Sequence, residues 1–195
     1  MGKPQDERRQ EIVEAALELA AEQGVKRVTT QAIADRVGIA QPTVFRHFKT
    51  RDAIFSSAID FLSAGLFKVL GEFFIGKGPA DERLRKLITK QIAFISQQKG
   101  LPRLLFSDRL HLESPALKAA VQKLMTRYMA NIAALIREGQ ASGCFNSQLD
   151  PDEASRYVAA LLQGLVMRWS IFDFEFELEQ ETDALWKFLF ASLRP

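Results

Sequence analysis

The segment spanning residues 28–54 constrains the fold of this chain more than any other. Ile33 and Val37 lie one helical turn apart and predict the inner face of a short helix. Gly38 suits the chain reversal that follows, because helices often end at a residue with positive φ, which glycine adopts without steric cost. Pro42 fits the first turn of a second helix, where its missing N–H is not needed. The segment therefore predicts two short helices joined by a tight turn.

The second of these helices has a face suited to DNA. Val44 and Phe48 lie four residues apart and are predicted to point inward. Polar, basic and small side chains then face outward near the N-terminal end, as in a recognition helix that enters a major groove. The outward residues are Gln41, Pro42, Thr43, Arg46 and His47.

The same segment resembles the helix-turn-helix of the TetR family of bacterial transcriptional regulators. The resemblance covers about residues 8–60, and the rest of the chain is similar to the family only in being helical and of the expected length. The matching residues, in order, are Thr30, Ile33, Ala34, Val37, Gly38, Ile39, Thr43, Val44, His47 and Phe48.

The resemblance implies how individual residues meet DNA. Gln41 is expected to pair its amide with adenine, and Pro42 to touch a thymine methyl group. Thr43, His47 and the backbone near Arg51 are expected to hold phosphates, which fix register without reading sequence. The full set of expected DNA-binding residues is Thr30, Gln31, Gln41, Pro42, Thr43, Phe45, Arg46, His47, Lys49 and Arg51.

Two residues of this set have further expected roles, and two others depart from the usual residues of the family. Gln31 is a second candidate for reading a base, and Arg46 reaches either guanine or a phosphate. Phe45 stands where the family usually has tyrosine and lacks the hydroxyl that would bond a phosphate. Arg51 stands in place of the usual lysine, which keeps the charge but forks the donors. Both departures imply altered phosphate contacts without loss of DNA binding.

The distribution of charge supports a nucleic-acid partner, although the net charge of +2 alone does not. Between residues 26 and 51, six lysines and arginines stand against one aspartate. This balance of +5 leaves −3 for the rest of the chain. A local basic face of this kind is typical of a module that meets phosphates. A plain solvated surface is the alternative, and the helix-turn-helix pattern favours DNA binding.

Composition predicts a soluble, cytoplasmic protein. The chain has 195 residues, of which 47% are hydrophobic, enough for a substantial core. No stretch approaches the ~20 uninterrupted apolar residues of a membrane span. The first ten residues are polar throughout and contain no secretory apolar segment. A single cysteine, Cys144, excludes an internal disulfide and fits a reducing compartment.

The pattern of helical stretches and breaks predicts an all-α fold of about nine helices. Breaks fall at 76–79 and 100–102, and Asp150 and Pro151 are predicted to cap and open a long helix. A short helix is expected over about 102–110, and the last helix over about 178–193. We expect an N-terminal three-helix helix-turn-helix DNA-binding domain over residues 1–53. A C-terminal helical domain over 54–195, implied by the resemblance to bind an effector and to dimerise, follows it.

The helix after Pro151 is apolar on nearly all sides between Tyr157 and Trp169, which predicts cover from a second subunit as well as from the chain itself. Together with the last helix it would form a four-helix bundle in a homodimer. An ordinary buried core helix is the alternative. The expected interface residues are Tyr157, Ala160, Leu161, Gly164, Leu165, Arg168, Leu185, Trp186 and Leu189.

Residues 171–179 alternate apolar and acidic side chains with period two, which is typical of a half-buried strand. Because no partner strand is evident, we expect an extended connector, with an extension of either neighbouring helix as the alternative. The acidic residues as far as Asp183 are interpreted as solvated surface, with no metal site.

Patterns for catalysis are scarce, and no catalytic residue, cofactor or metal site is predicted. Residues 71–78 imitate a phosphate-binding loop, but Gly78 stands where a hydroxyl would hold magnesium, and the loop follows no strand. His111 and Cys144 are interpreted as a loop residue and an incidental thiol. A small helical enzyme is therefore disfavoured.

The resemblance implies a homodimeric, ligand-responsive repressor that binds a palindromic operator and leaves it when a small, hydrophobic effector binds. A helical DNA-binding protein that answers to a protein partner and has no effector is the alternative. The aromatic residues point weakly to an apolar pocket, although ordinary core packing explains such residues equally. The candidate pocket residues are Phe67, Phe94, Phe106, Met125, Tyr128 and Trp169.

Overall fold

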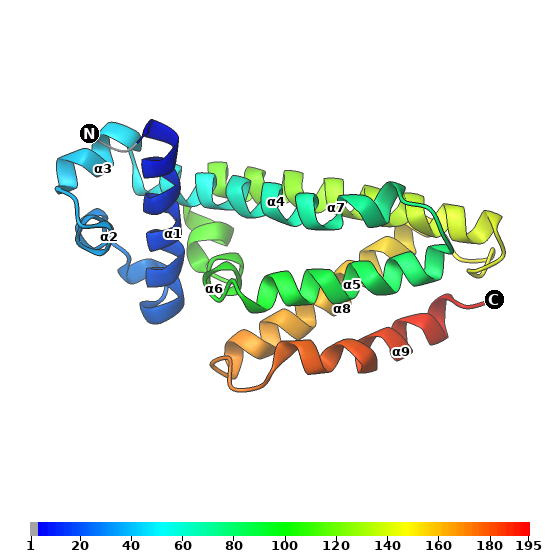
Figure 1. The fold of residues 1–195 in the computed structure, drawn as a ribbon. Coiled ribbons are helices and arrows are strands. Elements are labelled where there is room, and N and C mark those ends of the chain that lie inside the picture. Colours follow the sequence, from blue (N-terminus) through cyan, green and yellow to red (C-terminus); the bar gives the residue numbers. More distant parts are fainter. Residues whose placement is uncertain (1–3) are drawn as a thin grey trace. The chain divides into compact units, whose positions relative to one another are not determined.

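The computed structural model describes residues 4–195, and this part of the chain is helical without a strand (Figure 1). The all-α prediction and the number of helices are confirmed. The α-helices are α1 Gln5–Gln23, α2 Thr30–Val37, α3 Gln41–His47, α4 Arg51–Ile75, α5 Ala80–Ser96, α6 Gly100–Leu105, α7 Pro115–Ala141, α8 Pro151–Ile171 and α9 Thr182–Leu193. Three short helical turns accompany them: η1 Val25–Arg27, η2 Arg109–Glu113 and η3 Leu178–Glu181.

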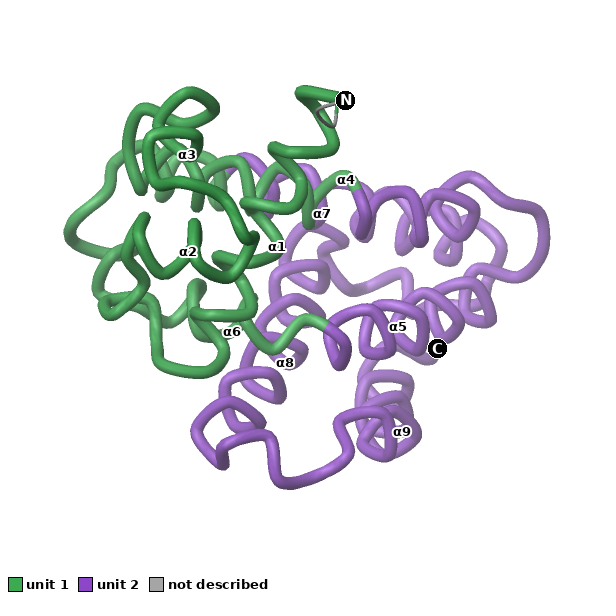
Figure 2. The backbone as a smooth tube through the Cα atoms, turned by 60° about the vertical axis from the view of Figure 1, so that its left-hand side comes forward, with its two compact units in different colours: residues 1–64, 98–122 green, residues 65–97, 123–195 purple. Residues whose placement is uncertain are grey.

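The chain divides into two compact units, coloured separately in Figure 2. Unit 1 contains residues up to 64 together with 98–122, and unit 2 contains 65–97 together with 123–195. Each unit is made of two separate segments, whereas one domain boundary after residue 53 is expected from the sequence. The helices α4 and α7 each begin in unit 1 and end in unit 2, so no break in the helices marks where one unit becomes the other.

Unit 1 is built around α1, which packs against η1, α2, α3 and α6. Ile12, Ala16 and Ala20 on α1 are fully buried. The first residue of α6, Gly100, lies so close to α1 that a Cβ atom there would come within 2.2 Å of the Leu17 carbonyl oxygen. Only glycine allows this approach, and it brings α6 into the same unit as the helix-turn-helix.

The ends of the two short helices are set locally. The side chain of Thr29 caps α2 by accepting a hydrogen bond from the Ala32 N–H at 3.0 Å. Gly38 ends α2 in the left-handed conformation with φ of 71°, as expected from the sequence. Pro42 lies in the first turn of α3. The predicted pair of short helices joined by a tight turn is confirmed.

The helix predicted over 102–110 is shorter and begins earlier. It ends at Leu105, and a separate π-helical turn, η2, follows over Arg109–Glu113. Arg109 in η2 forms an ion pair with Asp52 in the first turn of α4 and a second pair with Glu113 at 3.3 Å. These tertiary pairs hold the segment in place, and local sequence preference does not reveal them.

Unit 2 contains the C-terminal helices, in which α9 packs against α5 and α8. Asp150 caps α8 as predicted, because its carboxylate accepts from the backbone N–H groups of Asp152 and Glu153 at 2.7 and 3.0 Å. These two hydrogen bonds lower the pKa of Asp150.

The segment between α8 and α9 is a compact turn and not the extended connector expected from its alternating pattern. Asp173 and Phe174 both have positive φ, at 49° and 63°. The Trp169 indole N–H donates to the Phe176 carbonyl at 2.9 Å, and the Trp169 and Phe174 rings meet edge to face at 4.6 Å between centroids. Burial still alternates along this turn, because Phe174 and Phe176 are half-buried and the acidic residues beside them are exposed. The turn is therefore held by Trp169.

The end of α4 is fixed by one buried cation. Arg83 on α5 donates from Nε to the Phe73 carbonyl at 3.0 Å and from Nη2 to the Phe74 carbonyl at 2.8 Å. Its Nη1 pairs with the carboxylate of Glu138 on α7. Because the last carbonyls of a helix have no partner within it, Arg83 supplies the donors that the end of α4 needs.

The helix α4 is long and apolar enough to cross a membrane by length and composition alone, with a mean hydropathy of 1.6 over its most apolar window. Of that window, 44% is buried inside the protein. The core helix of a soluble protein meets the same criterion, and α4 carries buried side chains in both units, among them Phe55 and Leu70.

Replacing Arg83 should weaken unit 2 far more than replacing its neighbour Arg85. In Arg83→Ala, two α4 carbonyls lose their donors inside the protein, which we expect to cost about 2–3 kcal/mol. Arg85 pairs with Asp183 while both side chains are more than half exposed, so Arg85→Ala should cost about 1 kcal/mol or less. Urea unfolding followed by tryptophan fluorescence measures this, since both tryptophans lie in unit 2. Equal losses for the two variants would contradict the role of Arg83.

Candidate nucleic-acid interface

The first residues of α2 and α3 lie together in unit 1. Thr30 begins α2 and Gln41 begins α3, and the Gln41 side-chain Nε2 donates to Thr30 Oγ1 at 2.9 Å. This hydrogen bond holds the side-chain amide of Gln41 in place without DNA. Gln41 is the leading candidate for reading a base. The structure thus joins two residues that the sequence placed eleven positions apart.

The other expected DNA-binding residues lie on or beside these two helices, with graded exposure. Gln31, Pro42, Phe45, Arg46 and Lys49 are exposed. Half-buried positions belong to Thr30, Gln41, Thr43, His47 and Arg51. All ten residues belong to unit 1, so their common surface does not depend on the placement of unit 2.

The inner side of α3 is anchored to α1. Val44 is fully buried and Phe48 nearly so, as predicted. Arg9 on α1 donates from Nη1 to the His47 carbonyl at 2.6 Å, and its guanidinium lies 4.1 Å from the centroid of the Phe48 ring. Sequence reasoning missed Arg9, because no local pattern relates a residue near the start of α1 to the end of α3. Arg9 fixes the C-terminal end of the reading helix.

Two of the six cations counted from the sequence, Arg36 and Arg51, join separate elements of unit 1. Arg36 pairs with Glu22 at 2.6 Å and with Glu18 at 3.1 Å, both on α1. The hydrogen bonds to Glu22 and, to a smaller extent, to Glu18 raise the pKa of Arg36. The same hydrogen bond from Arg36 lowers the pKa of Glu22. Arg36 therefore contributes to the packing of α2 on α1, and less of its charge faces outward.

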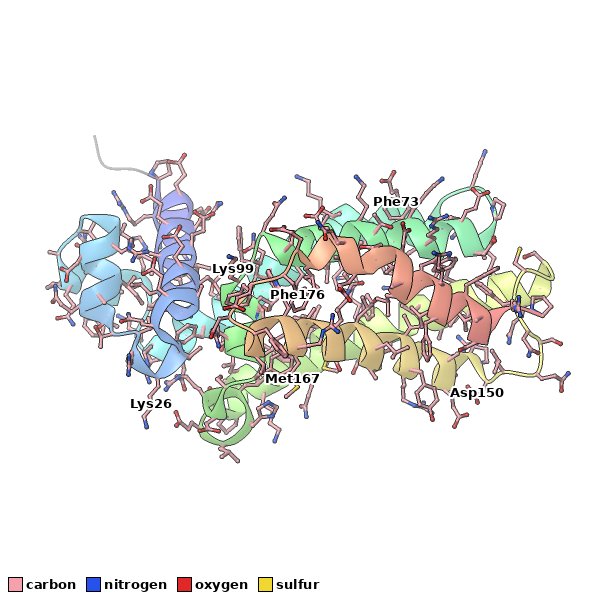
Figure 3. All side chains as sticks on the ribbon, turned by 90° about the horizontal axis from the view of Figure 1, so that it is seen from below. Lys26, Phe73, Lys99, Asp150, Met167 and Phe176 are labelled. Atoms are coloured by element: carbon pink, nitrogen blue, oxygen red, sulfur yellow. The ribbon has the colours of Figure 1, made fainter. Side chains whose placement is uncertain are left out.

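Arg51 is the second of these cations. Its Nη1 donates to the Val28 carbonyl at 2.9 Å and to the Lys26 carbonyl at 3.3 Å. These bonds tie the first residue of α4 to the chain that enters α2, a role that the sequence did not suggest. The remaining four cations are Lys26, Arg27, Arg46 and Lys49, all exposed. The side chain of Lys26 extends away from the ribbon in Figure 3.

The remaining polar contacts lie within the helices that would face DNA. Gln31 Nε2 donates to the Asp35 carboxylate at 2.7 Å, and Arg46 donates to Thr43 Oγ1 at 3.3 Å. Glutamine and aspartate four residues apart on a helix form such a bond readily. That spacing was the signal by which Asp35 could have been found from the sequence.

His47 lies in a positively charged and partly desolvated position. Its Nδ1 is buried without a hydrogen-bond partner. Burial, followed by the nearby charges of Arg46, Arg9 and Arg8, lowers the pKa of His47. The imidazole is therefore held neutral at a pH where an exposed histidine begins to take up a proton.

The candidate pocket residues fall into two groups. Phe67, Tyr128 and Trp169 are buried in unit 2, where Phe94 and Met125 are half-buried. Phe106 belongs to unit 1 and is 38% exposed.

Polar contacts accompany these aromatic residues in unit 2. Tyr128 donates its hydroxyl proton to Gln91 Oε1 at 2.6 Å, and full burial raises the pKa of Tyr128. The guanidinium of Arg127 lies 3.8 Å from the centroid of the Phe67 ring. Gln163 Nε2 lies 3.7 Å from the Met125 sulfur.

The expected dimer residues also fall into two groups. Tyr157, Ala160, Gly164 and Arg168 are exposed on α8, and Leu161, Leu165 and Leu185 are half-buried. Trp186 and Leu189 of α9 are only 9% and 4% exposed, so they pack inside the protomer. Within the protomer α9 turns them toward its own unit, and its exposed aromatic residue is Phe188, at 62%. The place of Trp186 and Leu189 in a dimer face stays a prediction.

Two segments of the chain match two family models. Residues 12–58 match the model of the bacterial regulatory proteins of the TetR family, and residues 77–171 match a tetracyclin repressor-like C-terminal domain. The chain therefore belongs to the TetR family of bacterial transcriptional regulators, as the resemblance predicted. Members of this family bind DNA as dimers and bind small molecules.

Similar proteins extend over nearly the whole chain. The nucleoid occlusion factor SlmA of Escherichia coli (strain K12 / DH10B) is 26% identical over 188 residues, which cover 96% of this chain and 95% of SlmA. The MbdR regulator of Azoarcus sp. CIB is 26% identical with a TM-score of 0.80, covering 95% of this chain and 98% of that structure. The transcriptional regulator FadR of Bacillus subtilis, solved in complex with stearoyl-CoA, has a TM-score of 0.80 at 21% identity, covering 94% of this chain and 98% of that structure.

Acidification should destabilise the protein through His47. Because the pKa of His47 is lower in the folded chain than the usual 6.5, the unfolded chain binds the proton first. The stabilisation from a neutral His47 is therefore present above about pH 6.5 and is lost as the pH falls toward the lowered value. Urea unfolding followed by circular dichroism, at pH 7.5 and 5.5, should show a smaller pH-dependent loss in His47→Gln than in the wild type.

The matched control for this comparison is His111→Gln, which removes the other histidine of the chain, exposed in η2. This variant should keep the pH dependence of the wild type. A His47→Gln protein with an unchanged pH dependence would show that His47 carries none of it.

Proposed function

We propose that this chain is a cytoplasmic, homodimeric transcriptional repressor that binds a palindromic operator and is released from it by a small hydrophobic effector. The observation that carries the DNA-binding part is the surface formed by the starts of α2 and α3. There Gln31 and Gln41 offer amides for base edges, and exposed Arg46 and Lys49 offer charge for phosphates.

Recognition follows from placing α3 in the major groove. Gln41 and Pro42 at its N-terminal end then meet base edges, and Thr43 and His47 follow the phosphates. Two copies related by a two-fold axis read two half-sites about 34–36 Å apart, one helical turn of DNA. The operator is therefore palindromic, and its symmetry matches that of the dimer.

The exposed face of α8 supports the homodimer. Tyr157 is 69% exposed and Ile171 63%, and Ala160 and Gly164 between them lie on the same side of the helix. Small residues among exposed apolar ones permit close approach of a second backbone. Phe188 on α9 is equally exposed.

The buried aromatic residues of unit 2 support the effector. Phe67, Tyr128 and Trp169 provide apolar surface, and the Tyr128–Gln91 pair provides polar atoms that can orient a ligand. Several solved proteins of the same fold were obtained with a small molecule, namely stearoyl-CoA, choline or triclosan. Proteins of this fold therefore accept small molecules of different chemistry.

A second candidate function is favoured by the similarity to SlmA, which extends over 95% of that protein. SlmA is a nucleoid occlusion factor. On this alternative the present chain would bind DNA and answer to a protein partner. It would then have no small-molecule effector. Both functions use the same DNA-reading surface, so only the response to ligands separates them.

The two functions are separated by selecting bound duplexes from a random pool and then titrating the selected complex with stearoyl-CoA and triclosan. A repressor of the proposed kind is stabilised against heat by one such hydrophobic compound and is released from its operator by that compound. Tight, sequence-selective binding that persists against a broad panel of hydrophobic compounds favours the second function. Failure to select any duplex at low salt would refute both.

A charge on the exposed face of α8 should separate the protomers. Tyr157→Glu puts an unpaired carboxylate into the proposed interface, which we expect to cost about 2 kcal/mol or more, about 30-fold in the dimer dissociation constant. Sedimentation velocity at micromolar concentration measures it. Ile75→Glu, at a 90% exposed apolar residue outside α8 and α9, is the matched control and should leave the dimer intact. Dissociation of both variants or of neither would place the interface elsewhere.

A further inference from the structure

The orientation of the Gln41 side-chain amide decides which base it can read. The two ends of a glutamine amide are nearly equal in size but opposite in hydrogen bonding, since the oxygen accepts and the nitrogen donates. In this structure the nitrogen faces Thr30, to whose Oγ1 it donates at 2.9 Å. The Oε1 atom and one remaining N–H are then left for a base edge.

The Thr30 hydroxyl is not the group that caps α2. The neighbouring Thr29 already caps α2 through the Ala32 N–H, and its carbonyl accepts from Ile33 at 3.0 Å. Thr30 is the first residue of α2 and half-buried, so its side chain does not belong to the core. Its contact with Gln41 joins the start of α2 to the start of α3.

The two possible orientations of the amide read different bases. With its nitrogen toward Thr30, Gln41 accepts through Oε1 and donates through one N–H, the pattern that matches adenine N6 and N7. With its oxygen toward Thr30, Gln41 offers two N–H donors, which suit the O6 and N7 acceptors of guanine. In that reversed state Gln41 would accept the Thr30 hydroxyl proton.

We infer that Thr30 is a positioning residue that makes Gln41 read adenine, and that it does so by donating its own hydroxyl proton to a DNA phosphate. Once the proton points to the phosphate, Thr30 Oγ1 can only accept from Gln41, so the amide nitrogen must face it. A contact with the DNA backbone thus sets the direction of a contact with a base. The inference rests on the proposed reading role of α3.

The second glutamine of the surface is oriented by a different group. Gln31 Nε2 donates to the Asp35 carboxylate at 2.7 Å. An ionised carboxylate only accepts, so it orients the Gln31 amide without any help from a phosphate. The two glutamines therefore allow a matched comparison, in which Asp35→Asn disturbs Gln31 and leaves Gln41 in place.

The test uses the full-length chain and a pool of random duplexes. Selection with the wild type and with Gln41→Ala first identifies the base pair that Gln41 reads. Selection is then repeated with Thr30→Val, which replaces the hydroxyl by a methyl group of the same shape, and with Thr30→Ser, which keeps the hydroxyl. We expect Thr30→Val to lower the preference for adenine over guanine at that base pair about tenfold. Thr30→Ser should retain most of the preference, and Asp35→Asn should leave it unchanged.

A double variant separates positioning from a general structural role. If Thr30 acts through Gln41, Thr30→Val should not change base preference further in the Gln41→Ala background. Equal weakening of all duplexes by Thr30→Val, with the adenine preference intact, would overturn the inference, as would a Gln41→Ala protein with unchanged preference. If Thr30→Val does not fold, loss of the adenine preference in the folded Thr30→Ser protein overturns it too. A wild-type chain that selects no duplex refutes the proposed function itself.

Discussion

The reading surface depends on the attachment of α3 to α1. A helix of seven residues is not stable in water by itself, because the first turn costs more than its few hydrogen bonds return. Val44 and Phe48 bury its inner side, and Arg9 holds its last carbonyl while packing on the Phe48 ring. The direction in which Gln41 and Arg46 point is therefore set by α1. The long first helix, which contributes none of the expected base contacts, determines the geometry of those contacts.

The same attachment changes how the charge of this region is understood. Residues 26–51 carry a balance of +5, but two of the six cations, Arg36 and Arg51, join separate elements of unit 1. Arg36 is neutralised by two glutamates of α1, and Arg51 holds backbone carbonyls through Nη1. Arg46 and Lys49 lie exposed beside the polar face of α3. Charge therefore remains near the residues expected to read bases, and this arrangement favours phosphates on either side of the groove that α3 would enter.

Features set by neighbouring residues could be predicted from the sequence, whereas features set by packing could not. Gly38, Pro42 and Asp150 act within a few residues, and the helix ends that they define are correct. The alternating pattern after α8 predicts an extended connector, but the segment is a compact turn. Its shape depends on Trp169, whose indole N–H donates to a carbonyl seven residues away. The inward side of α9 could not be predicted, because this helix is apolar on several sides and its packing against α5 and α8 decides which side is buried. Arg9 and the Gln41–Thr30 bond join separate helices, so no spacing rule could indicate them.

A ligand in unit 2 can change DNA affinity only if it favours one arrangement of the reading surface over another. The helices α4 and α7 each run without interruption from unit 1 into unit 2. The first two residues of α4 hold unit 1 together on two sides: Arg51 bonds the chain entering α2, and Asp52 pairs with Arg109 in η2. If Thr30 orients Gln41 as proposed, a displacement of the start of α4 would reach the proposed base-reading contact through the hydrogen bonds of Arg51 to the chain entering α2.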